Sequence, residues 1–414
     1  MRSLIATAVM AAALKQPARF ATLEVPPKDA ILGVKEEFLA DPAPAADKIN
    51  LSVGAYRTDE GEPWVLPPIA AARRRLVETM EHEYLASTGD AGYCAHAARL
   101  LYGSPGDEIA TVQSLSGTGS LRLCFEFLKR HYPDKTVYGP SCTWANHWNI
   151  LRDAGMNVEK YAYLDAAGLR LDWPALYADL EQAPDGSIVL LHLCAHNPSG
   201  NDPTRDQWKE LAALAKRKNF LPLFDSAYLG FASGDVDADA WPFRHFVDEG
   251  LAPWACVSFS KNFGLYSERA GAVHATCADA AEAAAVKANL GTLARALYSN
   301  PPAFGARLVA EVLGDDDLEK DWRQCLVTMS GRIAEMREAL RAALEARVPD
   351  RDWSHITSQI GMFSYTGLSA PQVMKLRADY HVYMLESGRL SMAGVTKGNV
   401  EPLADAIQAV LKEE

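Results

Sequence analysis

The chain has 414 residues, more than a single hydrophobic core usually organises, so we expect two domains or one large domain with a smaller partner. Hydrophobic residues make up 49% of the chain, which is ample for sizeable cores. Its formal net charge of −12 excludes the broad basic surface that binds nucleic acid or an anionic membrane. Anionic small molecules must therefore be bound by local arginines.

The first 22 residues are predicted to form an N-terminal extension. It carries Arg2, Lys15 and Arg19, has no acidic residue before Glu24, and contains an apolar run too short to span a bilayer. Two interpretations fit, a transit peptide for the mitochondrion or another organelle, and a helical extension of a cytoplasmic protein. A secretory signal is disfavoured, because the seven scattered cysteines contain no Cys-x-x-Cys pair and indicate a reducing compartment.

Between about residues 110 and 275 the chain alternates short apolar runs with amphipathic ones, which is typical of α/β architecture. Polar residues follow the expected strands at Asn197, Asp225 and Ser258, and ligands of open parallel sheets collect at such strand ends. This prediction rests on strands expected at 187–193, 221–225 and 255–259 and on a helix expected at 207–219.

The last quarter of the chain has a different pattern. A long amphipathic helix is expected over residues 318–346 and leads out of the large domain. The segments at 359–365, 382–384 and 389–393, followed by a helix at 403–411, predict a smaller α/β unit.

A candidate nucleophile stands in the run Ser-Phe-Ser-Lys-Asn-Phe-Gly-Leu, which begins at Ser258 and places Lys261 at the end of a buried strand. Desolvation favours the neutral amine, the form that attacks carbonyls and makes Schiff bases. A structural lysine is the alternative. The Ser-x-x-Lys pattern also occurs in serine β-lactamases, but their Ser-Asp-Asn and Lys-Thr-Gly motifs are absent here.

A candidate phosphate site begins at Ser116, Gly117 and Thr118, just before a helix expected over 121–129. Backbone N–H groups at a helix N-terminus bind anions. The run is neither a Walker loop nor a complete dinucleotide fingerprint. A helix cap alone would also explain it. Together with Ser258 and Arg269, it predicts a site for one phosphate group.

Four further residues suggest the nature of the ligand. Asp225 closes an apolar strand, and a protonated ring nitrogen would keep its carboxylate ionised. Trp144 can stack on a planar ring, and Arg295 and Arg389 can pair with substrate carboxylates. Taken singly, these residues fit a cap, a core position and surface charges. Jointly with Lys261 and the phosphate site, they predict pyridoxal 5′-phosphate as the cofactor.

A metal site is the competing interpretation of one segment. His192, Cys194 and His196 alternate in sequence, which makes zinc an alternative. The Asn-Pro-Ser-Gly run that follows indicates a different kind of site, so we predict no metal.

Several long motifs resemble those of the aspartate aminotransferase family, class I, of the fold-type I pyridoxal-phosphate enzymes. They extend from about Val25 to the C-terminus and lie at 50–57, 111–119, 194–200, 231–235, 258–266 and 361–363. The resemblance implies an α/β fold, with a large domain built on a mostly parallel sheet flanked by helices and a smaller α/β domain. We accordingly expect an extension at 1–22, an N-terminal arm with part of the small domain at 23–62, a large cofactor-binding domain at 63–315 and a small C-terminal domain at 316–414.

The resemblance also implies roles for the candidate residues. Lys261 would form the Schiff base and transfer protons, Asp225 would keep the ring nitrogen protonated with support from His147, and Tyr228 would be the third catalytic residue. The implied cofactor contacts are Ser116, Gly117, Thr118, Trp144, Asn197, Asp225, Tyr228, Ser258, Lys261 and Arg269, with Tyr84 from a second subunit. The implied substrate contacts are Gly54, Trp144, Asn197 and Arg389, with Arg295 from a second subunit. The active unit is thereby implied to be a homodimer with shared active sites.

Four residues depart from the family pattern without removing a group expected to touch cofactor or substrate. Ser199 replaces a threonine, Leu229 a glutamine, Ser52 a glycine and Cys142 a proline. Residues 85–93 differ more and leave the shape of the substrate entrance open.

The predicted activity is that of an aspartate transaminase, which transfers the amino group of L-aspartate to 2-oxoglutarate in two ping-pong half-reactions. The products are oxaloacetate and L-glutamate, and the expected partners are small amino and oxo acids rather than nucleic acid or membranes. One alternative is an aromatic amino acid aminotransferase that also accepts dicarboxylates. A pyridoxal-phosphate β-decarboxylase or lyase and a binding protein that retains the fold are the others.

Overall fold

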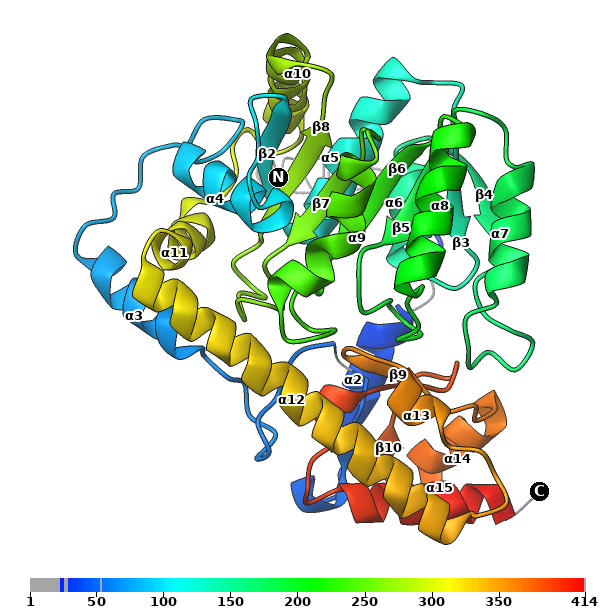
Figure 1. Ribbon diagram of the computed structural model, residues 1–414. Coiled ribbons are helices and arrows are strands. Elements are labelled where there is room, and N and C mark those ends of the chain that lie inside the picture. Colours follow the sequence, from blue (N-terminus) through cyan, green and yellow to red (C-terminus); the bar gives the residue numbers. More distant parts are fainter. Residues whose placement is uncertain (1–22, 26–28, 53, 413–414) are drawn as a thin grey trace, which may run out of the picture.

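The computed structural model describes residues 23–25, 29–52 and 54–412, and its centre is a seven-stranded sheet with helices on both faces (Figure 1). The predicted extension at residues 1–22 lies outside the described residues, so the structure tests neither the transit-peptide interpretation nor the cytoplasmic one. The strands of the sheet are β2 (Ile109–Leu115), β3 (Thr136–Pro140), β4 (Asn157–Tyr161), β5 (Ile188–His192), β6 (Leu221–Ser226), β7 (Trp254–Ser258) and β8 (Ala270–Thr276).

The strands lie in the order β2-β8-β7-β6-β5-β3-β4. All neighbouring pairs from β7 to β4 are parallel, whereas β8 runs antiparallel to both β7 and β2. The predicted α/β fold with a mostly parallel sheet is therefore confirmed. Because the parallel strands end at the same edge, the residues that follow β5, β6 and β7 are brought close together.

Side chains alternate between two hydrophobic cores, one on each face of the sheet. In β5, Val189 and Leu191 belong to one core and Ile188 and Leu190 to the other. The first core is covered by α4 (Ala91–Tyr102), α7 (Trp173–Gln182), α8 (Arg205–Arg217), α9 (Val236–Asp248) and α11 (Ala303–Leu313). The second core is covered by α5 (Ser116–His131), α6 (Asn146–Asp153) and α10 (Ala280–Leu297).

Helix α8 illustrates how local sequence sets an element. Thr204 accepts a hydrogen bond from the backbone of Gln207, and the Gln207 side chain accepts one from the backbone of Thr204, which makes a capping box. Trp208, Leu211 and Leu214 then recur at helical spacing and are buried.

A second, smaller group of elements lies beside the sheet, and the long helix α12 (Asp316–Arg347) runs from α3 (Pro67–Val77) and α11 to reach it (Figure 1). Residues from both ends of the chain build this group. The strand β1 (Ile49–Asn50) pairs in parallel with β10 (Val382–Tyr383), while β9 (Phe363–Tyr365) pairs antiparallel with β11 (Arg389–Ser391). The boundaries at residues 62 and 315 stay a prediction. The remaining elements are α2 (Ala30–Ala40), η1 (Ala45–Asp47), α13 (His355–Ser358), α14 (Ala370–Tyr380), η2 (Met392–Gly394) and α15 (Val400–Lys412).

Candidate active site

A cavity of about 200 Å³ opens where the parallel strands end. Asn197 follows β5, Asp225 lies near the end of β6 and Ser258 ends β7, as the spacing in the sequence predicts. The predicted site residues on its wall are Gly54, Ser116, Gly117, Thr118, Trp144, Asn197, Asp225, Tyr228, Ser258, Lys261, Arg269 and Arg389. One chain thus brings nearly all of the predicted residues together.

Lys261 follows β7, and its amine lies in a setting that favours the neutral form. Burial lowers its pKa from the ordinary value of 10.5, and the charge of Arg269 acts in the same direction, whereas Asp225 opposes the shift. Its Nζ lies 5.2 Å from the centre of the Tyr228 ring. A lysine with a lowered pKa at a cavity wall is suited to nucleophilic and proton-transfer chemistry.

Asp225 is the end of a chain of buried polar groups. Burial opposes its ionisation, but the hydrogen bond and the charge of His147 outweigh this effect and hold the pKa of the carboxyl below 3.8. His147 Nε2 lies 3.1 Å from Asp225 Oδ2, and its Nδ1 lies 2.8 Å from Thr143 Oγ1. Thr143 Oγ1 is in turn 2.7 Å from Nε2 of His192, whose pKa burial lowers to about 3. An ionised carboxylate is therefore ready to pair with a cation in the cavity.

The predicted phosphate site, called the anion cup below, contains three serine hydroxyls. One lies at the start of α5, and two lie at and just after the end of β7. Ser116 Oγ lies 2.9 Å from Ser258 Oγ and 2.7 Å from Ser260 Oγ. Arg269 donates to Ser260 Oγ at 3.5 Å and to the carbonyl of Tyr266 at 2.8 Å. The helix begins at Ser116 itself rather than near residue 121, so the Ser-Gly-Thr-Gly-Ser run is its first turn. The free N–H groups of that turn and the hydroxyls together suit a phosphate.

Gly117 is required by the close approach of this turn to β7. A Cβ atom at residue 117 would lie 3.2 Å from Ser258 Cβ, tighter than ordinary van der Waals contact. The glycine therefore lets the helix N-terminus and the Ser258 hydroxyl lie next to each other.

Arg389 provides a buried cation whose hydrogen bonds are incomplete. It is 2% exposed, donates from Nη2 to the carbonyl of Ser52 at 2.7 Å, and stacks on Phe363 with 4.2 Å from Cζ to the ring centre. Its Nε and the Oδ1 of Asn197 are both buried without a hydrogen-bond partner. Burial lowers the Arg389 pKa to about 10, so the guanidinium stays charged at neutral pH. A ligand carboxylate would complete its hydrogen bonds.

Two predicted residues are not on this wall. Tyr84 is 83% exposed and lines a separate groove with Met80 and Phe304. Arg295 is exposed at the end of α10 and donates to the hydroxyl of Ser299. Within one chain, neither residue reaches the cavity.

Five wall residues were not predicted from the sequence, namely Ile31, Leu121, Ala227, Ser260 and Phe363, and three of them are informative. Ser260 adds a hydroxyl to the anion cup, and its signal was the Ser-Phe-Ser spacing before the lysine. Phe363 lies under Arg389 and belonged to the Gly-Met-Phe motif. Ile31 comes from α2 and had no signal, because packing of the N-terminal helix brings it to the cavity.

The zinc alternative does not match the observed geometry. The rings of His192 and His196 lie 4.2 Å apart. Cys194 lines a cavity with Asp202 and Asp239, and neither histidine is on the wall of that cavity. Among the described residues, no group of three or more His, Cys, Asp or Glu side chains is arranged to hold a metal ion. The part of the chain that the structure describes also has no helix with the length and apolar character needed to cross a membrane.

Comparison with known proteins places the chain in a family. Residues 46–407 match the family model described as aminotransferase class I and II. The chain belongs to this family. Curated relatives of this aminotransferase include a cytoplasmic aspartate aminotransferase of Oryza sativa subsp. japonica, 47% identical over 95% of the chain and 98% of the relative. A mitochondrial aspartate aminotransferase of Arabidopsis thaliana is 46% identical over 94% of the chain and 92% of the relative.

Among solved structures, the aminotransferase resembles the aromatic-amino-acid aminotransferase of Burkholderia pseudomallei, which is covalently bound to pyridoxal phosphate. The two chains are 36% identical with a TM-score of 0.91, and the match covers 95% of this chain and 100% of the other. Since the likeness extends over both chains, the aminotransferase fold is shared as a whole.

Proposed function

We propose that this aminotransferase uses pyridoxal 5′-phosphate to transfer the amino group of L-aspartate to 2-oxoglutarate. The observation that carries the proposal is the single cavity that holds Lys261, Asp225, the Ser116 hydroxyl cluster and Arg389. Near-complete coverage of two aspartate aminotransferases, at 47% and 46% identity, supports aspartate as the amino donor.

The residues present fit the cofactor. The first turn of α5, the hydroxyls of Ser116, Ser258 and Ser260, and Arg269 would hold its phosphate. Asp225 would face the ring nitrogen, and Trp144 would flank the ring. The unpartnered Oδ1 of Asn197 indicates that the wall is completed by a polar ligand. When bound, pyridoxal phosphate supplies a carbonyl carbon that accepts amino groups and a ring that withdraws electrons from the substrate Cα.

The remaining steps fall to residues of the chain. Lys261, whose pKa burial lowers, would take the proton from the substrate Cα and deliver it to the cofactor carbon that receives the amino group, and the opposite half-reaction would reverse this transfer. Asp225, ionised because His147 holds its pKa down, keeps a proton on the ring nitrogen. Arg389 binds the α-carboxylate, and its stacking on Phe363 fixes the plane of the guanidinium. Half-buried Trp144 excludes water from one side of the cavity.

The active unit is proposed to be a homodimer. Tyr84 and Arg295 are exposed and lie away from the cavity of their own chain, so a second copy would supply them. Arg295 would then pair with the side-chain carboxylate of aspartate or glutamate. Mixed dimers of Arg295→Ala and Lys261→Ala chains would recover one functional site each. Absence of any recovery would contradict this arrangement.

The compartment is proposed to depend on residues 1–22. The two curated relatives are a cytoplasmic and a mitochondrial form. A fluorescent reporter that carries residues 1–22 would enter mitochondria or another organelle if they form a transit peptide, and would stay in the cytoplasm if they do not.

The aromatic aminotransferase is the second candidate, and the likeness to the Burkholderia pseudomallei enzyme supports it. A coupled assay of aspartate with 2-oxoglutarate, beside equal concentrations of phenylalanine and tyrosine, separates the two. We expect a higher kcat/KM with aspartate. A preference for phenylalanine or tyrosine would favour the aromatic candidate, and no turnover with any of the three would reject both.

A further inference from the structure

Two turns at neighbouring strand ends are each held by a carboxylate, that of half-buried Asp202 and that of buried Asp239. After β5, Asp202 accepts hydrogen bonds from the backbone N–H of Ala195 at 2.6 Å and of His196 at 2.8 Å, with one oxygen for each. Ala195 has a φ of 50°, a left-handed conformation that is uncommon for alanine. The carboxylate therefore holds a turn that the backbone alone does not favour.

The turn after β6 is held in the same way by Asp239. Its Oδ2 accepts from the N–H of Gly230 at 2.8 Å and of Ala232 at 3.1 Å, and its Oδ1 accepts from both the N–H and the hydroxyl of Ser233, at 3.1 and 2.6 Å. Gly230 has a φ of 90°, which a residue with a side chain rarely adopts.

Neither carboxylate has the character of a ligand site. Asp202 and Asp239 line a cavity of about 220 Å³ with Cys194, separate from the active-site cavity. Each of their four oxygens already accepts at least one hydrogen bond from the chain. Burial raises the pKa of Asp202 to about 6 and also raises that of Asp239. Removing a carboxylate from water costs free energy, and the hydrogen bonds that it accepts from the turn offset that cost.

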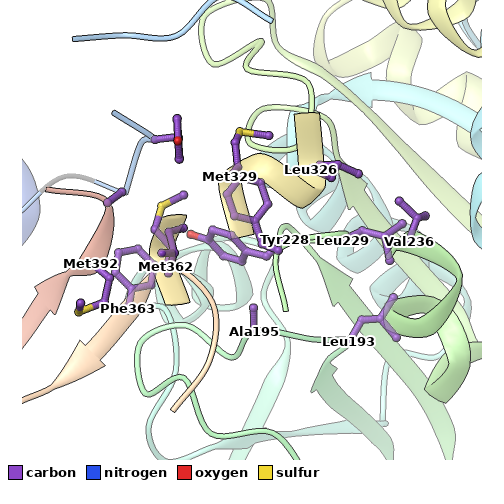
Figure 2. Close-up of a cluster of buried hydrophobic side chains, with 14 of the residues drawn as sticks. Leu193, Ala195, Tyr228, Leu229, Val236, Leu326, Met329, Met362, Phe363 and Met392 are labelled. Atoms are coloured by element: carbon purple, nitrogen blue, oxygen red, sulfur yellow. The ribbon is translucent and has the colours of Figure 1, made fainter. Parts of the chain in front are cut away.

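Both turns carry side chains into the active-site cavity. Asn197 follows Ala195 by two residues, and Tyr228 precedes Gly230 by two. Figure 2 shows Ala195, Tyr228 and Leu229 in one buried cluster with Met362 and Phe363. A Cβ atom at residue 361 would lie 2.4 Å from Ala195 Cβ, so the Ala195 turn packs directly against the segment that leads to Phe363. A shift of either turn would therefore move groups on the cavity wall.

We propose that Asp202 and Asp239 are positioning residues, which clamp the two turns from outside the cavity so that Asn197 and Tyr228 meet the cofactor. This inference rests on the proposed cofactor site. The carboxylates touch neither substrate nor cofactor, and they act through backbone N–H groups. Loss of a clamp should weaken cofactor binding more than it lowers the stability of the apoprotein.

The test compares cofactor binding by Asp202→Asn with that by Asp206→Asn. The Asp202→Asn amide turns one acceptor into a donor that faces a backbone N–H. Asp206 is a matched control four residues away, 85% exposed and paired with Lys209 on the surface. Apoprotein is titrated with pyridoxal 5′-phosphate, and binding is followed by quenching of tryptophan fluorescence. We expect about tenfold weaker binding for Asp202→Asn, as for loss of one hydrogen bond to a charged group, and no change for the control.

A double-variant cycle separates positioning from general destabilisation. If Asp202 acts through Asn197, then Asp202→Asn should have no further effect on binding in an Asn197→Ala background. If its effect on binding is the same in both backgrounds, the proposal for Asp202 is wrong. Melting temperatures of the four apoproteins show how much of the change is structural.

If Asp202→Asn does not fold, a milder variant still tests the proposal. Ser233→Ala removes one donor from the Asp239 clamp at an exposed position. It should weaken binding about threefold, as for a single neutral hydrogen bond. Wild-type affinity in folded variants of both clamps would overturn the inference. Failure of the wild-type protein to bind the cofactor would instead refute the proposed function.

Discussion

The wall of the active-site cavity and the two turns behind it, held by Asp202 and Asp239, differ in whether their polar atoms have hydrogen-bond partners in the chain. On the wall, Asn197 Oδ1 and Arg389 Nε have no partner in the chain. Behind it, every oxygen of Asp202 and Asp239 accepts a hydrogen bond. Unpartnered groups also occur elsewhere among the described residues, for example at Asn262, so an open bond indicates a ligand only where it faces a cavity. The comparison distinguishes polar groups that are left to bind a ligand from carboxylates that hold the two turns in place.

Removing the amine that we propose to be the reactive group should have the largest effect. Lys261→Ala leaves no amine for nucleophilic attack or proton transfer, and we expect kcat to fall by at least about 10⁴-fold. The change is measured by steady-state turnover of aspartate with 2-oxoglutarate. Lys397→Ala is a suitable control, because Lys397 is 62% exposed and paired with Glu335. Turnover within tenfold of wild type in Lys261→Ala would show that another residue carries the chemistry.

Replacing the buried cation of the wall, whose Nε has no hydrogen-bond partner, should come next. Arg389→Ala removes the guanidinium proposed to bind the α-carboxylate, so kcat/KM should fall by about 100-fold for every amino and oxo acid. Kinetics with aspartate and phenylalanine are the measurement, and Arg341→Ala, at a half-exposed position on α12, is the control. A loss confined to one substrate would reassign the role of Arg389.

Arg295→Ala should instead discriminate between substrates. We propose that this arginine meets only a side-chain carboxylate, so kcat/KM for aspartate should fall by about 100-fold while phenylalanine is little affected. The ratio of the two kcat/KM values is measured in one preparation. Equal losses for aspartate and phenylalanine would contradict the assignment.

A smaller effect is expected on the stability of the apoprotein. Below its lowered pKa, Lys261 is charged in the folded state and carries the full unfavourable effect of burial, whereas above 10.5 it is neutral in both states and the effect vanishes. Lys261→Met should therefore raise the melting temperature at pH 7, by about 2 °C. The gain should shrink as the pH approaches 10.5. A lower melting temperature for the variant at pH 7 would refute this account of the lysine.

The smallest effect concerns Asp41, a carboxylate that does not line the cavity. Asp41 accepts from Tyr383 at 2.6 Å and from the backbone of Ala43 at 2.8 Å, and these bonds, with His381, lower its pKa from 3.8 to about 2. The stability that it contributes is present above pH 3.8 and is lost as the pH falls toward 2. Acid unfolding of Asp41→Asn should be less steep than that of wild type over this interval. Identical acid transitions would show that Asp41 adds nothing.

Much of the fold could be predicted because it follows from local pattern. The continuous apolar run of β5 and the buried face of α8 are visible in the sequence, and the strand ends placed Asn197, Asp225 and Ser258 at one edge. The antiparallel β8 between β7 and β2 was not predictable, since its position depends on pairing between distant segments.

The candidate site was less accessible to sequence reasoning wherever backbone geometry decides the outcome. The start of α5 at Ser116 and the clamps at Asp202 and Asp239 depend on where N–H groups point, which residue types do not reveal. The exposed positions of Tyr84 and Arg295 depend on tertiary structure, and their proposed roles depend on a second chain. Lys261 was recognisable because a lysine at the end of a buried strand breaks the apolar pattern.

The most direct test of the central claim is the visible absorption spectrum of the purified protein, reconstituted with pyridoxal 5′-phosphate and mixed with L-aspartate alone. The account predicts that the band of the lysine-bound cofactor disappears, that the pyridoxamine form takes its place, and that 2-oxoglutarate then restores the first band. No spectral change with aspartate or any other dicarboxylic amino acid would contradict it.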